Sequence, residues 1–493
     1  MAQGNSGRNP RGGFRSSSRS HQSRPAKTGG GNGGRQRKQG NHTVSVDPAR
    51  QVALEVLTQV SQRGAYANLV LPQLLRKRKI SGRDAAFATE LTYGTLRAQG
   101  LADAILNEVS DRPVDRMDPA VLDILRLGVY QLLRTRVGVH AAVDTSVASC
   151  RTVGQGSATG FVNAILRKVS HRDEQQWVDI VAPDRTVDPV GYVATKFCHP
   201  RWIAEAFAQA LGAQAGELAD ALAADDARPK VHLAARPGEI SAEELALITG
   251  GQEGSYSPYA VYLDSGDPGD LDVVRQHMAA VQDEGSQLIA RATCTAATEG
   301  ADNGRWLDLC AGPGGKAAMM GALAGIDGAH VDAVEVSDTR AELVRNATSG
   351  LPVTVHIGDG RDPGLDGGYD RVLVDAPCSG LGALRRRPEA RWRKQPSDLV
   401  GLTTLQSELL ASAVQLTRPG GVIVYSTCSP HLRETRAIVD KAVRSFGLVE
   451  LAAEELVAPM SDTGTEQSVQ MWPHRHGTDA MFFAVLRVPT DRA

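Results

Sequence analysis

Two cysteines of this chain stand in matching contexts that suit covalent chemistry. Cys378 follows the largely apolar run 372–377, and Cys428 follows the run 422–427. Short apolar runs of this kind are typical of buried strands, so each cysteine is predicted to lie at the carboxyl end of a strand. A cysteine attacks an electrophilic carbon as its thiolate. One strand-end cysteine is usually a small buried side chain, but two in matching contexts favour a reactive pair.

A glycine-rich segment lies before both cysteines, at the end of the apolar run 306–310. Its glycines let the backbone approach a ligand closely, and the helix predicted after it offers free N–H groups and a positive dipole end. The segment does not match GxGxxG, and its proline argues against a dinucleotide pyrophosphate. It predicts a contact with another nucleotide-like cofactor, made by Cys310, Ala311, Gly312, Pro313, Gly314, Gly315 and Lys316.

Three acidic residues, Glu335, Asp359 and Asp375, stand at the ends of the next three apolar runs. Doubly wound sheets bind ligands in the crevice at the carboxyl ends of their strands. There Glu335 can accept hydrogen bonds from ribose hydroxyls, and Asp359 from an adenine amino group. Each acid alone could be an ordinary loop-capping residue, but together with the glycine turn they favour a cofactor site. S-adenosylmethionine is the natural ligand for it.

The last part of the chain, residues 276–493, alternates between strand-like and helix-like patterns. The strand-like runs cover 306–310, 331–336, 353–357, 371–374, 421–426 and 481–488, and the helices 315–325, 338–349, 403–417 and 433–446. This alternation predicts a Rossmann-like α/β domain, a parallel sheet covered on both faces. The last run has no helix between it and the end of the sequence and could insert antiparallel.

Two further domains are predicted before residue 276, consistent with a length of 493 residues. Residues 47–171 repeat apolar side chains at helical spacing without β-type alternation, which predicts an all-α domain. Residues 172–275 mix helix-like and strand-like patterns with loops rich in Gly and Asp, so we expect a small α+β connecting domain there.

The first 46 residues form a basic tail. They hold nine Lys or Arg and no Asp or Glu, so the remaining residues carry a formal charge of −11 although the whole chain has only −2. The tail is rich in Gly, Ser, Asn and Gln and is predicted to be disordered. It is either a loose electrostatic arm for RNA or a solubilising extension, and its Arg and Gly content favours the arm.

A second basic segment directly follows Cys378. Six basic residues and a tryptophan beside the proposed site predict contacts with RNA phosphates and stacking on an unpaired base, the alternative being a solvated loop. These residues are Arg385, Arg386, Arg387, Arg391, Trp392, Arg393 and Lys394.

The six cysteines are scattered and show neither zinc-ligand spacing nor a disulfide framework. No stretch approaches the roughly 20 apolar residues that span a bilayer, and the start of the sequence lacks an apolar signal core. We therefore expect a cytoplasmic monomer without a bound metal and without a membrane partner.

The two cysteine segments, Asp375-Ala-Pro-Cys-Ser-Gly380 and Ser426-Thr-Cys-Ser429, together with the glycine turn, resemble the RsmB/Sun family of RNA cytosine-C5 methyltransferases. Residues 47–171 look like the NusB-type RNA-binding domain that precedes the catalytic domain in some members. The resemblance covers residues 47–488. It is specific in the last 200 residues and looser in the middle.

The resemblance implies a role for each chemical group. Cys428 would be the nucleophile that adds to carbon 6 of cytosine, and Cys378 would assist product release. Asp375 and Lys316 would hold the base. The implied cofactor is S-adenosylmethionine, and the implied partner is RNA, with small-subunit ribosomal RNA as the expected substrate.

Four alternatives compete with this interpretation. The same chemistry could act on transfer RNA. A non-catalytic RNA-binding regulator would need only the helical domain, which leaves the two cysteines unexplained. A NAD-dependent dehydrogenase would need a dinucleotide turn, and a DNA methyltransferase would give no reason for a Thr-Cys pair at Cys428.

Overall fold

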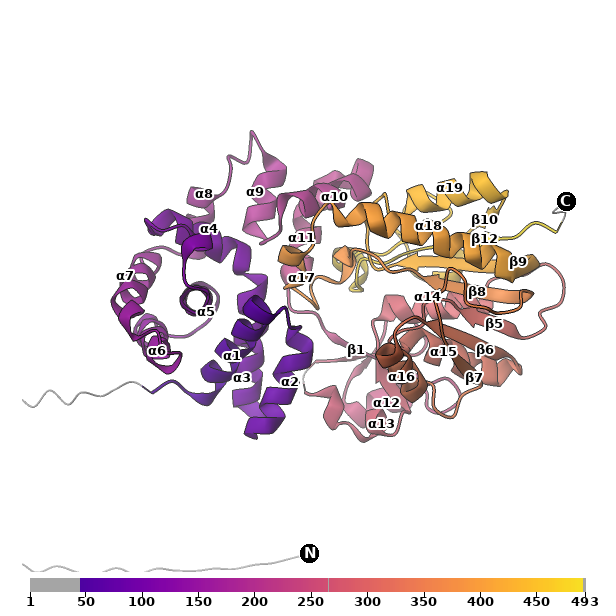
Figure 1. Cartoon of the computed structure of the whole chain (residues 1–493), viewed down its shortest axis with the longest axis horizontal. Coiled ribbons are helices and arrows are strands. Elements are labelled where there is room, and N and C mark those ends of the chain that lie inside the picture. Colours follow the sequence, from indigo (N-terminus) through magenta and orange to yellow (C-terminus); the bar gives the residue numbers. More distant parts are fainter. Residues whose placement is uncertain (1–44, 265, 491–493) are drawn as a thin grey trace, which may run out of the picture. The chain divides into compact units, whose positions relative to one another are not determined.

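The computed structural model describes residues 45–264 and 266–490 (Figure 1). The predicted tail, 1–46, lies almost entirely outside them. The described residues belong to one compact unit. Within the described ranges, no helix is long and apolar enough to cross a membrane.

The first part of the described chain is entirely helical, as predicted. It begins where the Asp47 carboxylate accepts a hydrogen bond from the Arg50 N–H and Pro48 occupies the first turn. Apolar side chains at helical spacing pack into one buried core, which includes Leu57, Leu106 and Ile124. The helices are α1 (Pro48–Arg63), α2 (Ala67–Arg78), α3 (Gly82–Arg97), α4 (Gln99–Val109), α5 (Pro119–Arg134), α6 (Val139–Thr152) and α7 (Thr159–Val169).

The middle part combines four helices with a small antiparallel sheet. The helices are α8 (Glu174–Val181), α9 (Pro189–Lys196), α10 (Arg201–Leu211) and α11 (Leu218–Asp226). The sheet has the order β2-β3-β1-β4 and is flanked by α12 (Ala242–Thr249) and α13 (Asp272–Arg275). Its strands are β1 (Val231–Ala235), β2 (Gln252–Glu253), β3 (Ala260–Leu263) and β4 (Ala279–Val281).

The last part contains a large mixed sheet with the order β10-β12-β9-β8-β5-β6-β7, to which β11 adds by pairing with β12. Strands β5 to β9 pair in parallel, whereas β12 pairs antiparallel with both β9 and β10. The predicted antiparallel insertion of the last run is therefore confirmed. The strands are β5 (Arg305–Asp308), β6 (His330–Glu335), β7 (Val353–Ile357), β8 (Tyr369–Asp375), β9 (Thr417–Thr427), β10 (Val449–Leu451), β11 (Val469–Gln470) and β12 (Phe482–Arg487).

Helices cover both faces of this sheet, which explains why its central strands are apolar at consecutive positions. Leu373 and Val424 pack in the core under α14 and α15, while Val372, Val374 and Tyr425 pack under α18 and α19 (Figure 1). The helices are α14 (Glu284–Thr295), α15 (Gly315–Asp327), α16 (Asp338–Ala347), α17 (Ala390–Arg393), α18 (Asp398–Leu416), α19 (Arg436–Phe446) and α20 (Pro473–His476). The predicted multidomain fold is confirmed: a helical N-terminal part and a C-terminal doubly wound sheet.

Candidate active site

The two cysteines meet at the carboxyl edge of the large sheet. Strands β8 and β9 are parallel neighbours with Asp375 opposite Ser426, so the turns that follow them lie side by side. The Cys378 and Cys428 sulfur atoms are 3.4 Å apart, and both side chains are partly exposed. The sheet thus brings two thiols from residues 50 positions apart into hydrogen-bonding contact.

The surroundings of the two thiols separate their acidities. A hydrogen bond from Cys378 and the positive charge of Lys316 lower the pKa of Cys428, against the opposing effects of burial and of Asp375. The same hydrogen bond and burial raise the pKa of Cys378 well above its ordinary value. The two directions make Cys428 the better thiolate of the pair, and when Cys428 is ionised, Cys378 is the donor of the hydrogen bond.

An ion pair lies next to Cys428. The Lys316 ammonium is 2.7 Å from Oδ2 of Asp375, and the Ser426 hydroxyl donates to Oδ1 of the same carboxylate at 2.9 Å. Although burial opposes it, the Asp375 charge raises the pKa of Lys316, so the amine stays protonated. The site thus offers an ammonium donor and a carboxylate acceptor beside Cys428.

The glycine turn after β5 is held against the end of β6. The Gly312 N–H donates to Glu335 Oε2 at 3.1 Å, and the Ser337 N–H donates to Oε1 at 3.0 Å. A Cβ atom at Gly312 would lie 2.1 Å from Glu335 Oε2, and Gly314 has a φ of +113°. Both positions therefore need glycine, and the contact of this turn with a cofactor stays a prediction.

Asp308, the last residue of β5, was not among the predicted site residues. Its side chain is buried, Oδ1 accepts from the Cys310 N–H, and Oδ2 has no hydrogen-bond partner among the described residues. Burial raises its pKa to about 7. Its position at a strand end, directly before the glycine turn, was the available signal. An unpartnered acid here fits a cofactor that carries a donor group.

The third predicted acid, Asp359, is placed differently. Its carboxylate is about 40% exposed and is held by the Arg361 guanidinium, with Oδ2 2.6 Å from the nearest nitrogen. The hydrogen bonds from Arg361 lower the pKa of Asp359 to about 2. Asp359 follows β7 at the same sheet edge as Glu335, and no side chain among the described residues joins the two.

The other four cysteines are poor nucleophiles. Burial raises the pKa of Cys150, Cys198, Cys294 and Cys310. Cys310 packs against the core under α18 and α19, so only its backbone is available to the turn. No group of three or more His, Cys, Asp or Glu suited to a metal occurs within residues 45–264 and 266–490.

Comparison with known proteins decides which family this site belongs to. The model of the 16S rRNA methyltransferase RsmB/F family matches residues 295–487, and that of the NusB family matches residues 47–171. A putative methyltransferase of Mycobacterium tuberculosis is 57% identical over 452 residues, which are 92% of this chain and 99% of the relative. The ribosomal RNA small subunit methyltransferase B of Klebsiella pneumoniae is 31% identical over 77% of this chain and 86% of its own length.

This chain belongs to the RsmB/F methyltransferase family.

Solved structures support the same fold. The crystal structure of PH0851 superimposes with a TM-score of 0.73 at 20% identity and covers 90% of this chain and 99% of its own. That of NSun6 from Pyrococcus horikoshii gives 0.50 at 18% identity, over 59% of this chain and 99% of its own. At these identities the likeness concerns architecture alone.

The basic segment of this RsmB/F family member is built differently from the prediction. The Arg391 side chain is fully buried and bonds Asp225 at 3.0 Å and Asp226 at 3.1 Å. The Arg393 guanidinium donates to three backbone oxygens at the end of α1, those of Val60, Gly64 and Ala65. Both side chains tie the catalytic part to the helical parts, which corrects the expectation that they face RNA.

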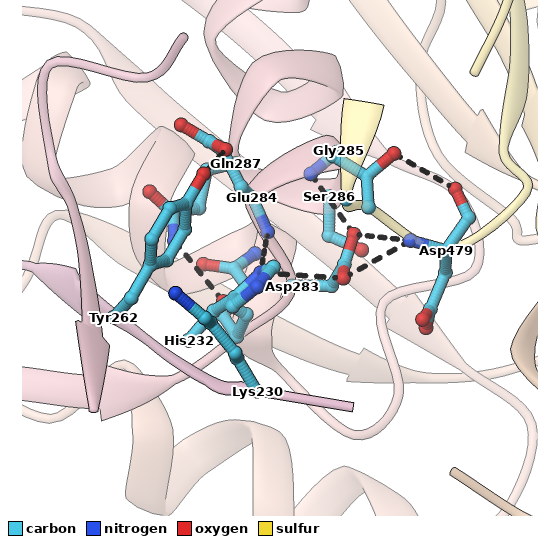
Figure 2. A network of polar contacts seen from close by, with 12 residues as sticks. Lys230, His232, Tyr262, Asp283, Glu284, Gly285, Ser286, Gln287 and Asp479 are labelled. Atoms are coloured by element: carbon cyan, nitrogen blue, oxygen red, sulfur yellow. Dashed lines mark hydrogen bonds and ion pairs between the residues drawn. The ribbon is translucent and has the colours of Figure 1, made fainter. Parts of the chain in front are cut away.

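Arg385 and Arg386 also turn inward. Arg385 bonds Asp479 at 2.6 Å, and Arg386 bonds Asp283 at 2.7 Å. Figure 2 shows Asp283 between His232 and Asp479. The backbone N–H of Asp479 donates to both carboxylate oxygens of Asp283 at 3.2 Å. Burial lowers the pKa of His232 to about 4, so the ring is neutral there. Buried guanidinium groups need such acidic partners, and these two have no free donor fork for phosphate.

Three members of the segment remain. One edge of the partly exposed Trp392 ring lies so close to Gly100 on α4 that a Cβ atom there would be 2.4 Å away, so this edge packs against the protein. Arg387 is exposed and Lys394 is partly exposed, and neither forms a side-chain ion pair with any described residue. RNA contact stays a prediction for these two.

Proposed function

We propose that this protein transfers a methyl group from S-adenosylmethionine to carbon 5 of a cytosine in ribosomal RNA, through a covalent bond between Cys428 and the base. The observation that carries the proposal is the pair of thiols 3.4 Å apart, beside an ion pair of Lys316 and Asp375. The natural setting for this activity is a monomer in the cytoplasm.

The chemistry explains why two thiols and an ion pair are needed. Carbon 5 of cytosine is a poor nucleophile until the Cys428 thiolate adds to carbon 6, which moves an electron pair towards carbon 5. Carbon 5 would then take the methyl group as its bond to the cofactor's sulfonium breaks, which leaves a neutral thioether. Loss of the carbon-5 proton to water restores the ring double bond and returns the electron pair of the bond between sulfur and carbon 6 to Cys428. Lys316 and Asp375 hold the ring nitrogen and the exocyclic amine during these steps.

Membership of a methyltransferase family supports S-adenosylmethionine as the cofactor, which supplies an electrophilic methyl sulfonium when bound. The glycine turn 310–316, Glu335, Asp359 and Asp375 would hold it, with Asp308 added by its unpartnered oxygen. The turn offers backbone donors and Glu335 offers acceptors. Both fit an adenosyl group with a charged amino-acid tail.

Ribosomal RNA is the substrate favoured by the names of the relatives, such as the Klebsiella pneumoniae enzyme, and by the RsmB/F description. The NusB-type match over residues 47–171 supports contact with RNA by the helical part. Transfer RNA with the same chemistry remains the second candidate. A purely regulatory RNA-binding role would leave the paired thiols without a task.

A direct assay tests this proposal. The purified full chain is incubated with labelled S-adenosylmethionine and, in parallel, unmodified 16S rRNA, transfer RNA or DNA, and the nucleosides are then identified by mass spectrometry. We expect 5-methylcytidine in the ribosomal RNA and none with Cys428→Ala. A methyl group on another atom, or preferential labelling of DNA, would overturn the proposal.

A further inference from the structure

The buried carboxylate of Glu434 forms hydrogen bonds with both turns that carry the cysteines. Ser379 follows Cys378, Ser429 follows Cys428, and both serines bond Glu434, which is fully buried. The Ser379 N–H donates to Glu434 Oε1 at 2.8 Å, and the Ser429 hydroxyl donates to Oε2 at 2.8 Å. The Ser379 hydroxyl also donates to Oε2. One side chain thus holds equivalent positions of two turns that come from different strands.

Glu434 is itself fixed in place. The Gln406 amide on α18 donates to Glu434 Oε1 at 3.1 Å and to the Pro377 carbonyl at 2.9 Å. The Tyr425 hydroxyl on β9 donates to the Glu434 backbone carbonyl at 2.7 Å. A carboxylate accepts at about four positions, and here donors occupy all of them. Such an arrangement suits an ionised carboxylate with no proton of its own.

Different charged groups face the two sulfur atoms. Cys378 is faced by Cys428, by the Glu434 carboxylate and by Tyr425, and the Glu434 charge contributes to the raised pKa of Cys378. Cys428 is faced by Cys378, by Lys316 on α15, by Asp375 at the end of β8 and by Asp479 before β12. The Glu434 charge therefore acts on Cys378, whereas Cys428 is faced by the cation Lys316 as well as by the acids Asp375 and Asp479.

We propose that Glu434 is a positioning residue with two roles. Its hydrogen bonds fix the relative position of the two turns that carry the cysteines, and its charge keeps Cys378 as the neutral thiol beside the Cys428 thiolate. This inference deepens the proposed function and rests on it for the roles of the two cysteines. Glu434 touches neither substrate nor cofactor and acts through the serines and the Cys378 thiol.

The arrangement has a consequence for product release. When the bond between sulfur and carbon 6 breaks, the electron pair stays on the Cys428 sulfur. A neutral Cys378 can donate a hydrogen bond to that sulfur and stabilise it as a leaving group. An ionised Cys378 could not donate and would repel it. Glu434 thus favours release by keeping the proton on Cys378.

Thiol titration tests this assignment without any RNA. The full-length protein and its Glu434→Gln variant are alkylated with iodoacetamide over a range of pH, and each cysteine is followed by peptide mass spectrometry. We expect the alkylation midpoint of Cys378 to fall by about one pH unit in Glu434→Gln, because a nearby negative charge is lost. Asp440→Asn, which removes a carboxylate from an ion pair on α19, should leave the midpoint unchanged.

Two further variants separate charge from attachment. Ser429→Ala keeps the charge of Glu434 but removes one bond, so it should lower kcat for methyl transfer without moving the Cys378 midpoint. Glu434→Asp keeps the charge but shortens the side chain, so the alkylation midpoint of Cys378 should equal that of the parent protein although the hydrogen bonds from the serines weaken. This variant therefore reports on the charge independently of how well Glu434→Gln folds. An unchanged midpoint in a folded Glu434→Gln protein, or equal shifts in Asp440→Asn, would overturn the proposal. Failure of the methylation assay alone would count against the proposed function instead.

Discussion

The reactivity of Cys428 is set by its immediate neighbours rather than by its own exposure. Burial raises the pKa of a thiol, and for Cys198 burial together with the negative charge of Asp226 raises it to about 12. Cys428 departs in the other direction because Cys378 donates to it and Lys316 faces it. A neutral partner and a nearby cation are the two devices that stabilise a thiolate in a partly dry site.

Lys316→Met should make this dependence measurable. The variant removes the cation that lowers the pKa of Cys428, so that pKa rises and less thiolate is present at neutral pH. Because the thiolate exists above the pKa, we expect methyl transfer at neutral pH to fall by about tenfold or more and to recover partly as pH increases. The pH dependence of kcat/KM measures this. Lys441→Met, at an exposed position of α19, is the control and should leave the profile unchanged.

Asp359→Ala tests whether Asp359 takes part in binding the adenine group of S-adenosylmethionine. If Asp359 accepts a hydrogen bond from the adenine amino group, its loss should weaken S-adenosylmethionine binding by about 1–3 kcal/mol. Isothermal titration calorimetry on the folded variant gives the answer. Glu408→Gln, which removes only the second acidic partner of Arg361, should bind normally, and unchanged affinity in Asp359→Ala would remove Asp359 from the site.

At the scale of elements, the carboxyl edge of the sheet is what assembles the site. Strand β5 ends before the glycine turn, β6 ends at Glu335, and β8 and β9 lead into the cysteine turns. The turn after Cys378 also packs backbone to backbone with the segment before β12. The Gly382 N–H donates to the Cys428 carbonyl, and the Ala480 N–H donates to the Gly382 carbonyl, each at 2.9 Å.

Gly382→Ala should disrupt this contact. A Cβ atom at Gly382 would lie 1.8 Å from the Ala480 carbonyl oxygen, so the two segments must separate. We expect a loss of about 1–3 kcal/mol in unfolding free energy, typical of overpacking, together with a loss of methyl transfer. Urea unfolding measures the first. Gly401→Ala in α18 has open space around it and should be neutral or stabilising, so a similar loss there would contradict the argument.

The elements themselves were largely predictable from the sequence, because both faces of the sheet are covered and each central strand is a continuous apolar run. The short strands β10 and β11 were missed, since two or three residues carry no periodicity. Asp308 and Glu434 were missed for another reason. Asp308 stands at a strand end before the glycine turn, which is a signal in the sequence, but only the fold shows that one of its oxygens lacks a partner. Glu434 gives no such signal, and only the fold shows that it joins two turns.

At the scale of the whole described molecule, the segment 385–394 links parts that lie far apart in sequence. The sequence shows its positive charge but not the acids that meet it, because Asp225, Asp283 and Asp479 come from three different regions. A basic run beside an active site therefore does not by itself predict a nucleic-acid contact. Its charges can equally be matched inside the protein.

A comparison of Arg391→Met with Arg387→Ala separates these two uses of positive charge. Arg391→Met removes the cation that Asp225 and Asp226 share inside the protein, although His199 and Arg134 still contact them, so it should destabilise the protein by about 3 kcal/mol. Arg387→Ala should hardly change stability, but the logarithmic salt dependence of RNA binding should become shallower by about one unit, as for one lost phosphate contact. Denaturant unfolding and salt-dependent binding measure the two effects, and exchanged phenotypes would contradict the assignment.

The central claim, covalent catalysis with divided roles for the two thiols, is tested most directly by trapping the protein on its RNA. Cys378→Ser should still add to the base and methylate it but should release the product slowly. A covalent complex of protein and RNA should then survive denaturing electrophoresis, and it should vanish in the double variant with Cys428→Ala. A stable complex in the Cys428→Ala single variant instead would make Cys378 the nucleophile and contradict the account.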